Sequence, residues 1–103
     1  MVSLVYPQGT LSKATRVESH QIIVGLSEVS LPTPSLRKVL WVFLKADDDN
    51  TSPVFIGESG VSDSSGFRLN RSQGVLLDCS DVSSIRLISS ASDQKVSVLY
   101  GGV

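Results

Sequence analysis

An unbroken apolar run of six residues, VLWVFL at positions 39–44, constrains the fold of this chain more than any other feature. The run is too short for a typical helix, and its β-branched and aromatic side chains favour a strand. Since neither face of the run is polar, we expect a central strand buried on both sides. Alternation along the strand places Leu40, Val42, Leu44 and Ala46 on one face and Val39, Trp41 and Phe43 on the other.

The chain after this run alternates between short strands and turns. The expected strands span residues 53–57, 67–69, 75–79, 85–88 and 95–100, and Gly, Ser, Asn and Asp fill the segments between them. The strands at 39–44 and 53–57 should pair as a β-hairpin around a turn at 47–50. In a chain of 103 residues that is poor in Ala, this pattern predicts one all-β domain, a small antiparallel β-sandwich or a jelly-roll-like barrel.

The first third of the chain is less regular. One strand is expected at residues 21–26 and another at residues 2–6. Pro32 and Pro34 each lack a backbone donor, so residues 31–34 should be an extended connector. We therefore expect an N-terminal arm or a set of edge strands at residues 1–30 and a β-sandwich core at residues 31–103, within a single domain.

Apolar side chains on the common faces of these strands should form the core. They are Leu40, Val42, Leu44, Val54, Ile56, Leu69, Val75, Leu77, Ile85, Leu87, Val96 and Val98. A slip of one residue in the run at 39–44 would exchange its two apolar faces. The residue pattern therefore determines the register of this strand less firmly than that of the other strands.

Residue types that carry chemistry are scarce. His20 is the only histidine and Cys79 the only cysteine, which excludes an intrachain disulfide, a thiolate zinc site and any site with two imidazoles. The run of Asp47, Asp48 and Asp49 lacks the glycine and the distal glutamate of an EF-hand, and we interpret it as a solvated turn. We expect no catalytic residues, no bound metal and no cofactor.

The formal net charge of −1 gives no indication of nucleic-acid binding. No apolar run is long enough to span a membrane, so no membrane partner is expected. The first residues show no basic region followed by an apolar stretch, so we expect no signal peptide and synthesis in the cytoplasm.

The second apolar face of the strand at 39–44 is the strongest candidate for an interaction site. It carries Trp41 and Phe43, and in so small a domain it should pack either on a second layer of the same domain or on another subunit. Both possibilities stay open at this stage. The apolar residues Val2, Leu4 and Tyr6 are further candidates for subunit contacts, because the first 30 residues could reach a neighbour.

Four segments resemble small structural proteins of tailed bacteriophages, such as head decoration, head-fibre and fibre-base modules. They are KADDDNTSPVFIGESGV at 45–61, GFRL at 66–69, QGV at 73–75 and KVSVLY at 95–100. The resemblance covers residues 31–101, although the turn at 70–74 lacks the Pro-Gly that is frequent in such proteins. It implies a β-sandwich or jelly-roll-like virion protein without catalytic residues. Such a protein would decorate or stabilise the particle by binding the major capsid protein or other virion proteins, as a homo-oligomer for which a trimer is favoured.

Two other functions are compatible with the sequence. The chain could be a carbohydrate-binding or host-surface-binding module of a fibre or tail, with Trp41, Tyr6 or Tyr100 exposed as a platform for a sugar. A small hydrolase or nucleotide-binding barrel is the third possibility, and the single histidine and the absence of a phosphate-binding loop weigh against it.

Overall fold

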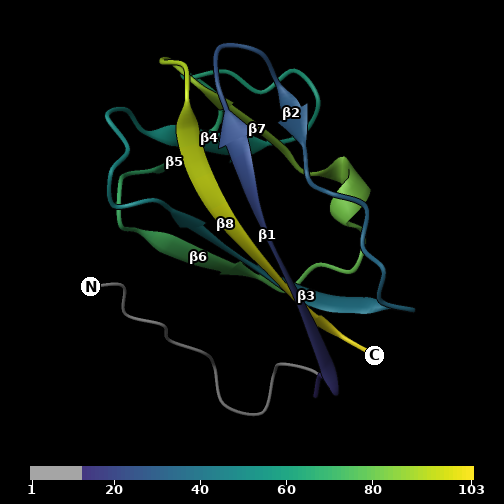
Figure 1. Cartoon of the computed structure of the whole chain (residues 1–103). Helices are drawn as coiled ribbons and strands as arrows, with labels where there is room; N and C mark the ends of the chain where they lie inside the picture. The colour runs from purple at the N-terminus through teal and green to yellow at the C-terminus, as the bar shows by residue number, and fades with distance from the viewer. Residues whose placement is uncertain (1–12) are drawn as a thin grey trace.

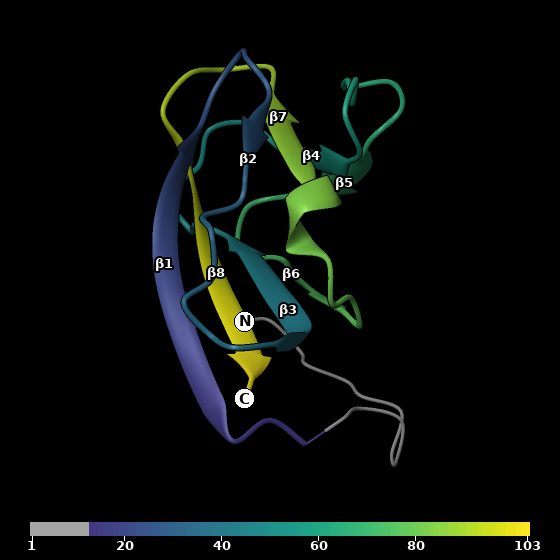
Figure 2. The same cartoon turned by 90° about the vertical axis from the view of Figure 1, so that its right-hand side faces the viewer.

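The computed structural model describes residues 13–103, which form two four-stranded antiparallel sheets (Figures 1 and 2). Strands make up 47% of the described residues and helix 3%. The predicted all-β fold, a small antiparallel β-sandwich, is confirmed. No helix within residues 13–103 is long and apolar enough to cross a membrane.

The first sheet contains the longest strands and has the order β1-β8-β3-β6. These strands span Arg16–Val24 (β1), Gln94–Gly102 (β8), Val39–Ala46 (β3) and Gly74–Leu77 (β6). The apolar run at 39–44 therefore lies in β3, an inner strand that pairs with both β8 and β6. The expected central position of this strand is confirmed. The expected burial of both its faces is wrong, because Trp41 and Phe43 on the second face are only half-buried.

The second sheet is made of shorter strands in the order β2-β7-β4-β5. They span Val29–Ser30 (β2), Arg86–Ser89 (β7), Val54–Gly57 (β4) and Phe67–Leu69 (β5). A single 3₁₀ turn, η1 (Val82–Ser84), precedes β7, and the side chain of Asp81 caps it by accepting a hydrogen bond from the Ser83 amide.

The prediction that the strands at 39–44 and 53–57 pair as a β-hairpin is wrong. β3 belongs to the first sheet and β4 to the second, so the segment between them crosses from one sheet to the other. Buried polar side chains hold this crossing. The Gln94 side chain accepts hydrogen bonds from the Thr51 and Ser52 amides at 2.8 and 2.9 Å. Asn50 exchanges two hydrogen bonds with the backbone of Lys95, so the acidic segment is tied to β8.

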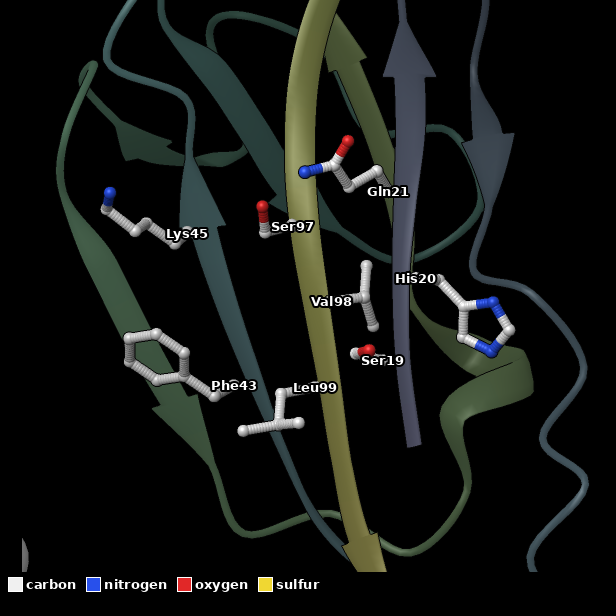
Figure 3. Close-up of a pocket in the computed structure, with 8 residues that line it drawn as sticks. All are labelled: Ser19, His20, Gln21, Phe43, Lys45, Ser97, Val98 and Leu99. Atoms are coloured by element: carbon white, nitrogen blue, oxygen red, sulfur yellow. The ribbon is translucent and has the colours of Figure 1, made fainter. Parts of the chain in front are cut away.

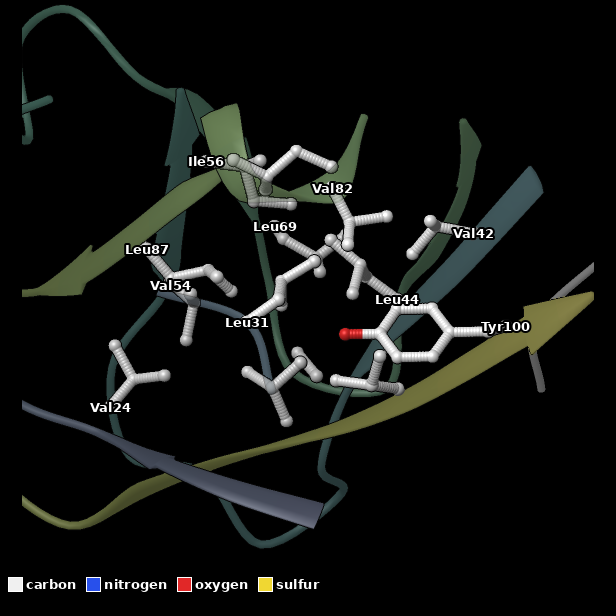
Figure 4. Close-up of a cluster of buried hydrophobic side chains, with 14 of the residues drawn as sticks. Val24, Leu31, Val42, Leu44, Val54, Ile56, Leu69, Val82, Leu87 and Tyr100 are labelled. Carbon is white, nitrogen blue, oxygen red and sulfur yellow. The ribbon is translucent and has the colours of Figure 1, made fainter. Parts of the chain in front are cut away.

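The core lies between the two sheets, where Tyr100 projects among aliphatic side chains (Figure 4). Nine of the twelve expected core residues are buried, namely Val42, Leu44, Val54, Ile56, Leu69, Ile85, Leu87, Val96 and Val98. Val75 and Leu77 are half-buried and pack against this cluster. The connector before β3 also contributes, because Leu31 and Leu36 are buried in the same core.

Leu40 is the one expected core residue that the fold turns away from the core cluster. The pairing of β3 with β8 is irregular between Val39 and Trp41, so that Val39 opposes Gly102 and Trp41 opposes Gly101. Leu40 is the extra residue of this bulge and is only half-buried. Val39 takes the core position instead, with 5% of its surface exposed, because an extra residue reverses the alternation before it.

The strand expected at 21–26 starts earlier and ends sooner than predicted. β1 covers Arg16–Val24, pairs with β8 along its whole length and forms one edge of the first sheet. Residues 31–38 form the connector without a strand, as the prolines indicate. The strand expected at residues 2–6 lies outside the described residues.

Candidate functional site

The outer face of the first sheet, the side turned away from the second sheet, is the candidate site. Register places its side chains in three rows across the strands. The tryptophan row contains Val17, Gly101 and Trp41. The phenylalanine row contains Ser19, Leu99, Phe43 and Leu76. The polar row contains Gln21, Ser97, Lys45 and Gly74. Ile23 and Lys95 oppose each other beyond the polar row.

Trp41 fills the place that a side chain of β8 would take. A Cβ atom built on Gly101 would lie 2.2 Å from both Cε2 and Cζ2 of the indole, so the six-membered ring stands above the glycine backbone. Any other residue at position 101 would displace the ring. Gly101 is itself buried under the indole, and Trp41 is half-buried, with the rest of its ring open to solvent.

Phe43 and Leu99 are neighbours on β3 and β8 and border a shallow depression on this face (Figure 3). The depression has a volume of about 440 Å³. Its other walls include the polar side chains of Ser19, Gln21, Lys45 and Ser97. The outer face therefore combines two rows that are largely apolar with one row of hydroxyl, amide and ammonium groups.

On the second sheet, by contrast, the outward-facing side chain of Phe55 is covered by the chain itself. Phe55 alternates with the core residues Val54 and Ile56, and it is nevertheless buried, with 6% of its surface exposed. The segment between β4 and β5 approaches it: a Cβ atom on Gly66 would lie 2.7 Å from Cβ of Phe55 and 2.8 Å from Val61. Val61 is also buried. Within residues 13–103, no comparable segment covers Trp41 and Phe43, which stay half-buried.

A polar cluster joins the edge strand β1 to the connector at residues 31–38. The Glu18 carboxylate lies 2.5 Å from Nε2 of His20 and accepts a hydrogen bond from the Ser35 amide at 2.8 Å. The bond to His20 and then the Ser35 amide lower the pKa of Glu18. Tyr100 touches the same cluster, since its ring meets the His20 ring edge-on at 5.8 Å. These contacts account for His20 as a structural residue on an edge strand.

The acidic segment is fixed by ordinary loop contacts. Asp48 accepts hydrogen bonds from Ser72 Oγ at 2.7 Å and Lys45 Nζ at 3.2 Å, and these two partners lower its pKa. Asp47 accepts from the Asp49 amide. Among residues 13–103, no three His, Cys, Asp or Glu side chains converge in a way that could hold a metal ion.

The structure brings together two of the five predicted interface residues. Trp41 and Phe43 lie in adjacent rows of the outer face, whereas Val2, Leu4 and Tyr6 lie outside the described residues. Tyr100 was an alternative platform for a sugar, and that assignment is wrong because its side chain is fully buried. Sequence alternation in β1, β6 and β8 could have identified Val17, Leu76 and Leu99 as further members of this face, once the pairing of the strands was known.

No known protein family, curated protein or solved structure gives a significant match to this chain. The outer face offers a surface for binding, with aromatic and aliphatic side chains at one end and hydrogen-bonding groups at the other.

Proposed function

We propose that this chain is a structural protein of a bacteriophage particle, a capsid decoration or head-fibre type of protein that binds its own copies and the major capsid protein or other virion proteins. Two independent features support the proposal. The turn and strand segments between residues 31 and 101 resemble such proteins, and the fold is a small β-sandwich of the kind that this resemblance implies. In this proposal the chain has no catalytic role.

The observation that carries the proposal is the uncovered outer face of the first sheet. A domain of about 100 residues has a limited core, and it gains little by leaving two aromatic side chains at its surface unless something covers them. The loop over Phe55 demonstrates that this fold can cover an outward aromatic residue with its own chain. Trp41 and Phe43 lack such a cover within residues 13–103, as expected of a subunit whose neighbours complete it.

Particles purified from a lysate of the phage that encodes this chain provide the test. We expect quantitative mass spectrometry to find the chain in those particles in a fixed ratio to the major capsid protein. A phage with the gene deleted should yield particles that lack this chain and break at a lower temperature or after milder osmotic shock. Particles that never contain the chain would contradict the proposal.

Carbohydrate binding is the second candidate, and the position of Trp41 favours it. An indole held flat to a sheet by a glycine beneath it is a rigid apolar surface. On the same face, Ser19, Gln21 and Ser97 supply hydrogen-bonding groups around the depression beside Phe43. Because Trp41 is the only tryptophan, titration of its fluorescence with oligosaccharides of the host surface would detect this function. The virion role is preferred because the outer face joins its aromatic residues to aliphatic ones, Val17, Leu76 and Leu99, over three of the other strands.

A further inference from the structure

We infer that copies of this chain bind one another through the outer face of the first sheet, with the tryptophan and phenylalanine rows at the centre of the contact. This inference deepens the proposed function and depends on it for the setting in which copies meet. The occupant of the face is thus a second copy of the same chain.

The outer face has apolar side chains in its centre and polar side chains in the next row, as a protein–protein interface does. Trp41, Phe43, Leu76 and Leu99 are half-buried, and Val17 at the end of the tryptophan row is 65% exposed. The polar groups lie in the next row along the strands, where Gln21 is exposed. An apolar centre bordered by polar side chains is the usual arrangement of a protein–protein interface, and half-buried aromatic anchors supply most of its binding energy.

The two apolar rows of one copy can pack against the two apolar rows of a second copy. In the simplest arrangement, a two-fold axis runs across the strands between the tryptophan and phenylalanine rows. This axis lays each apolar row on the other apolar row of the second copy. Trp41 then faces Phe43 of the second copy, and the polar row falls at the rim. A three-fold arrangement of the kind that the resemblance favours would turn the same two rows toward the axis.

Charge on the face also favours a second copy over a charged partner. Among the described strand residues of this face, Lys45 and Lys95 alone carry charge, both outside the apolar rows, and Lys45 is paired with Asp48 at 3.2 Å. Two copies can approach without placing like charges at the centre. A nucleic acid or an anionic lipid surface would instead require a concentration of basic groups that the face lacks.

The area of the face sets the expected strength of association. Four strands about 4.8 Å apart and up to nine residues long cover about 500 Å² in projection. Two such faces bury about 1,000 Å² together, which is the lower limit for a specific interface. Association of isolated chains should therefore be weak and should appear between micromolar and millimolar concentration. A lattice that presents many copies would strengthen it by raising the effective concentration.

The test compares two matched substitutions in the full chain by sedimentation equilibrium and light scattering up to millimolar concentration. Phe43→Lys places a charge at the centre of the proposed contact. Phe67→Lys makes the same change on β5 of the other sheet, where the phenylalanine is 59% exposed. The wild type and Phe67→Lys should both form dimers or trimers, and Phe43→Lys should be monomeric at every concentration. Thermal melts by circular dichroism establish that each variant is folded. If Phe43→Lys fails to fold, Leu99→Lys on the neighbouring strand takes its place.

Two results would overturn the inference. One is a wild-type chain that stays monomeric at millimolar concentration, as it would if its own residues 1–12 covered the face. The other is association that persists in Phe43→Lys or is lost equally in Phe67→Lys. Neither result bears on whether the chain occurs in particles, so a monomeric chain found in particles would overturn the inference alone. A self-associating chain absent from particles would contradict only the proposed function.

Discussion

The indole ring of Trp41 stands in the space above Gly101 that a side chain of β8 would fill, and each residue thereby fixes the other. Gly101→Ala should therefore shift the ring or the strand beneath it. The new Cβ would lie 2.2 Å from two ring atoms, and overpacking of this kind typically costs about 1–3 kcal/mol of unfolding free energy. Chemical denaturation measures the cost, and the emission of the single tryptophan reports its displacement. Gly25→Ala is the matched control, because its Cβ would have no neighbour closer than 3.7 Å, so it should behave like the wild type in emission.

Tyr100 should make the folded protein less stable at alkaline pH. Its hydroxyl donates a hydrogen bond to the Pro32 carbonyl at 2.5 Å, and burial, with a smaller effect of the Glu18 charge, raises its pKa from 10.0 to about 12. Between these two pH values the unfolded chain loses a proton that the folded protein retains, so the free energy of unfolding should fall as the pH rises from 10 to 12. Below pH 10 this group should have no effect on the pH dependence.

The Tyr100→Phe variant isolates that contribution. At neutral pH it should be less stable by about 1–3 kcal/mol, since the Pro32 carbonyl loses its partner in the connector. Its stability should then decline less steeply than that of the wild type between pH 10 and 12. Urea denaturation at several pH values checks both points, and parallel declines of the two proteins would show that another group is responsible.

Of the described polar residues, Gln94 should be the most sensitive to substitution. It is 2% exposed and accepts hydrogen bonds from two consecutive amides, those of Thr51 and Ser52, in the segment that crosses between the sheets. Gln94→Met keeps the shape of the side chain but leaves both amides without a protein partner. The free energy of unfolding should fall by about 1–3 kcal/mol for each amide. Gln73→Met removes a similar bond, to the Asn70 amide, at an exposed site and should cost far less. Equal losses in the two variants would contradict a structural role for the buried network.

The acidic segment should be dispensable for stability. Replacing Asp47, Asp48 and Asp49 together by Asn should change the free energy of unfolding by no more than about 0.5 kcal/mol, because exposed ion pairs such as Lys45–Asp48 contribute little. Calcium should not raise the melting temperature of the wild type. A large rise with calcium that disappears in the triple variant would mean that the native state binds the ion.

Removal of residues 1–12 separates folding from assembly. The described strands pair among themselves from Arg16 to Gly102, so the shortened chain should keep its circular dichroism spectrum and its cooperative melt. If the proposed virion role is correct, incorporation into particles should be lost, since the removed segment includes the candidate contact residues Val2, Leu4 and Tyr6. If the shortened chain is incorporated as well as the full chain, the contacts lie on the sheet alone.

Periodicity predicted strand positions well and strand partners poorly. The run at 39–44 and the alternation at 95–100 identified β3 and β8, because a strand between two layers needs apolar side chains at regular intervals. The hairpin failed because proximity in sequence favours adjacent pairing, whereas here the segment after β3 crosses to the other sheet. That crossing depends on Gln94, which lies more than 40 residues along the chain from its partners. No local pattern could reveal such a contact.

The candidate site was predictable only in part, for the same reason. Trp41 and Phe43 stood out because the run at 39–44 has two apolar faces. Leu99 in β8 joins them through its pairing with Phe43, 56 residues earlier in the sequence, and Val17 in β1 joins them through its pairing with Gly101, 84 residues later. The bulge at Leu40 was equally invisible, since it follows from how β3 pairs with β8 rather than from residue type.

Trp41 provides the most direct measurement, because the only tryptophan of the chain lies in the middle of the proposed contact. Acrylamide quenching of its fluorescence should be measured from micromolar to millimolar protein for the wild type and for Phe43→Lys. The wild type should become progressively harder to quench and its emission should move to shorter wavelength, while the variant should stay quenchable throughout. A wild-type indole that is equally accessible at every concentration, in a chain that nevertheless associates, would contradict association through the outer face.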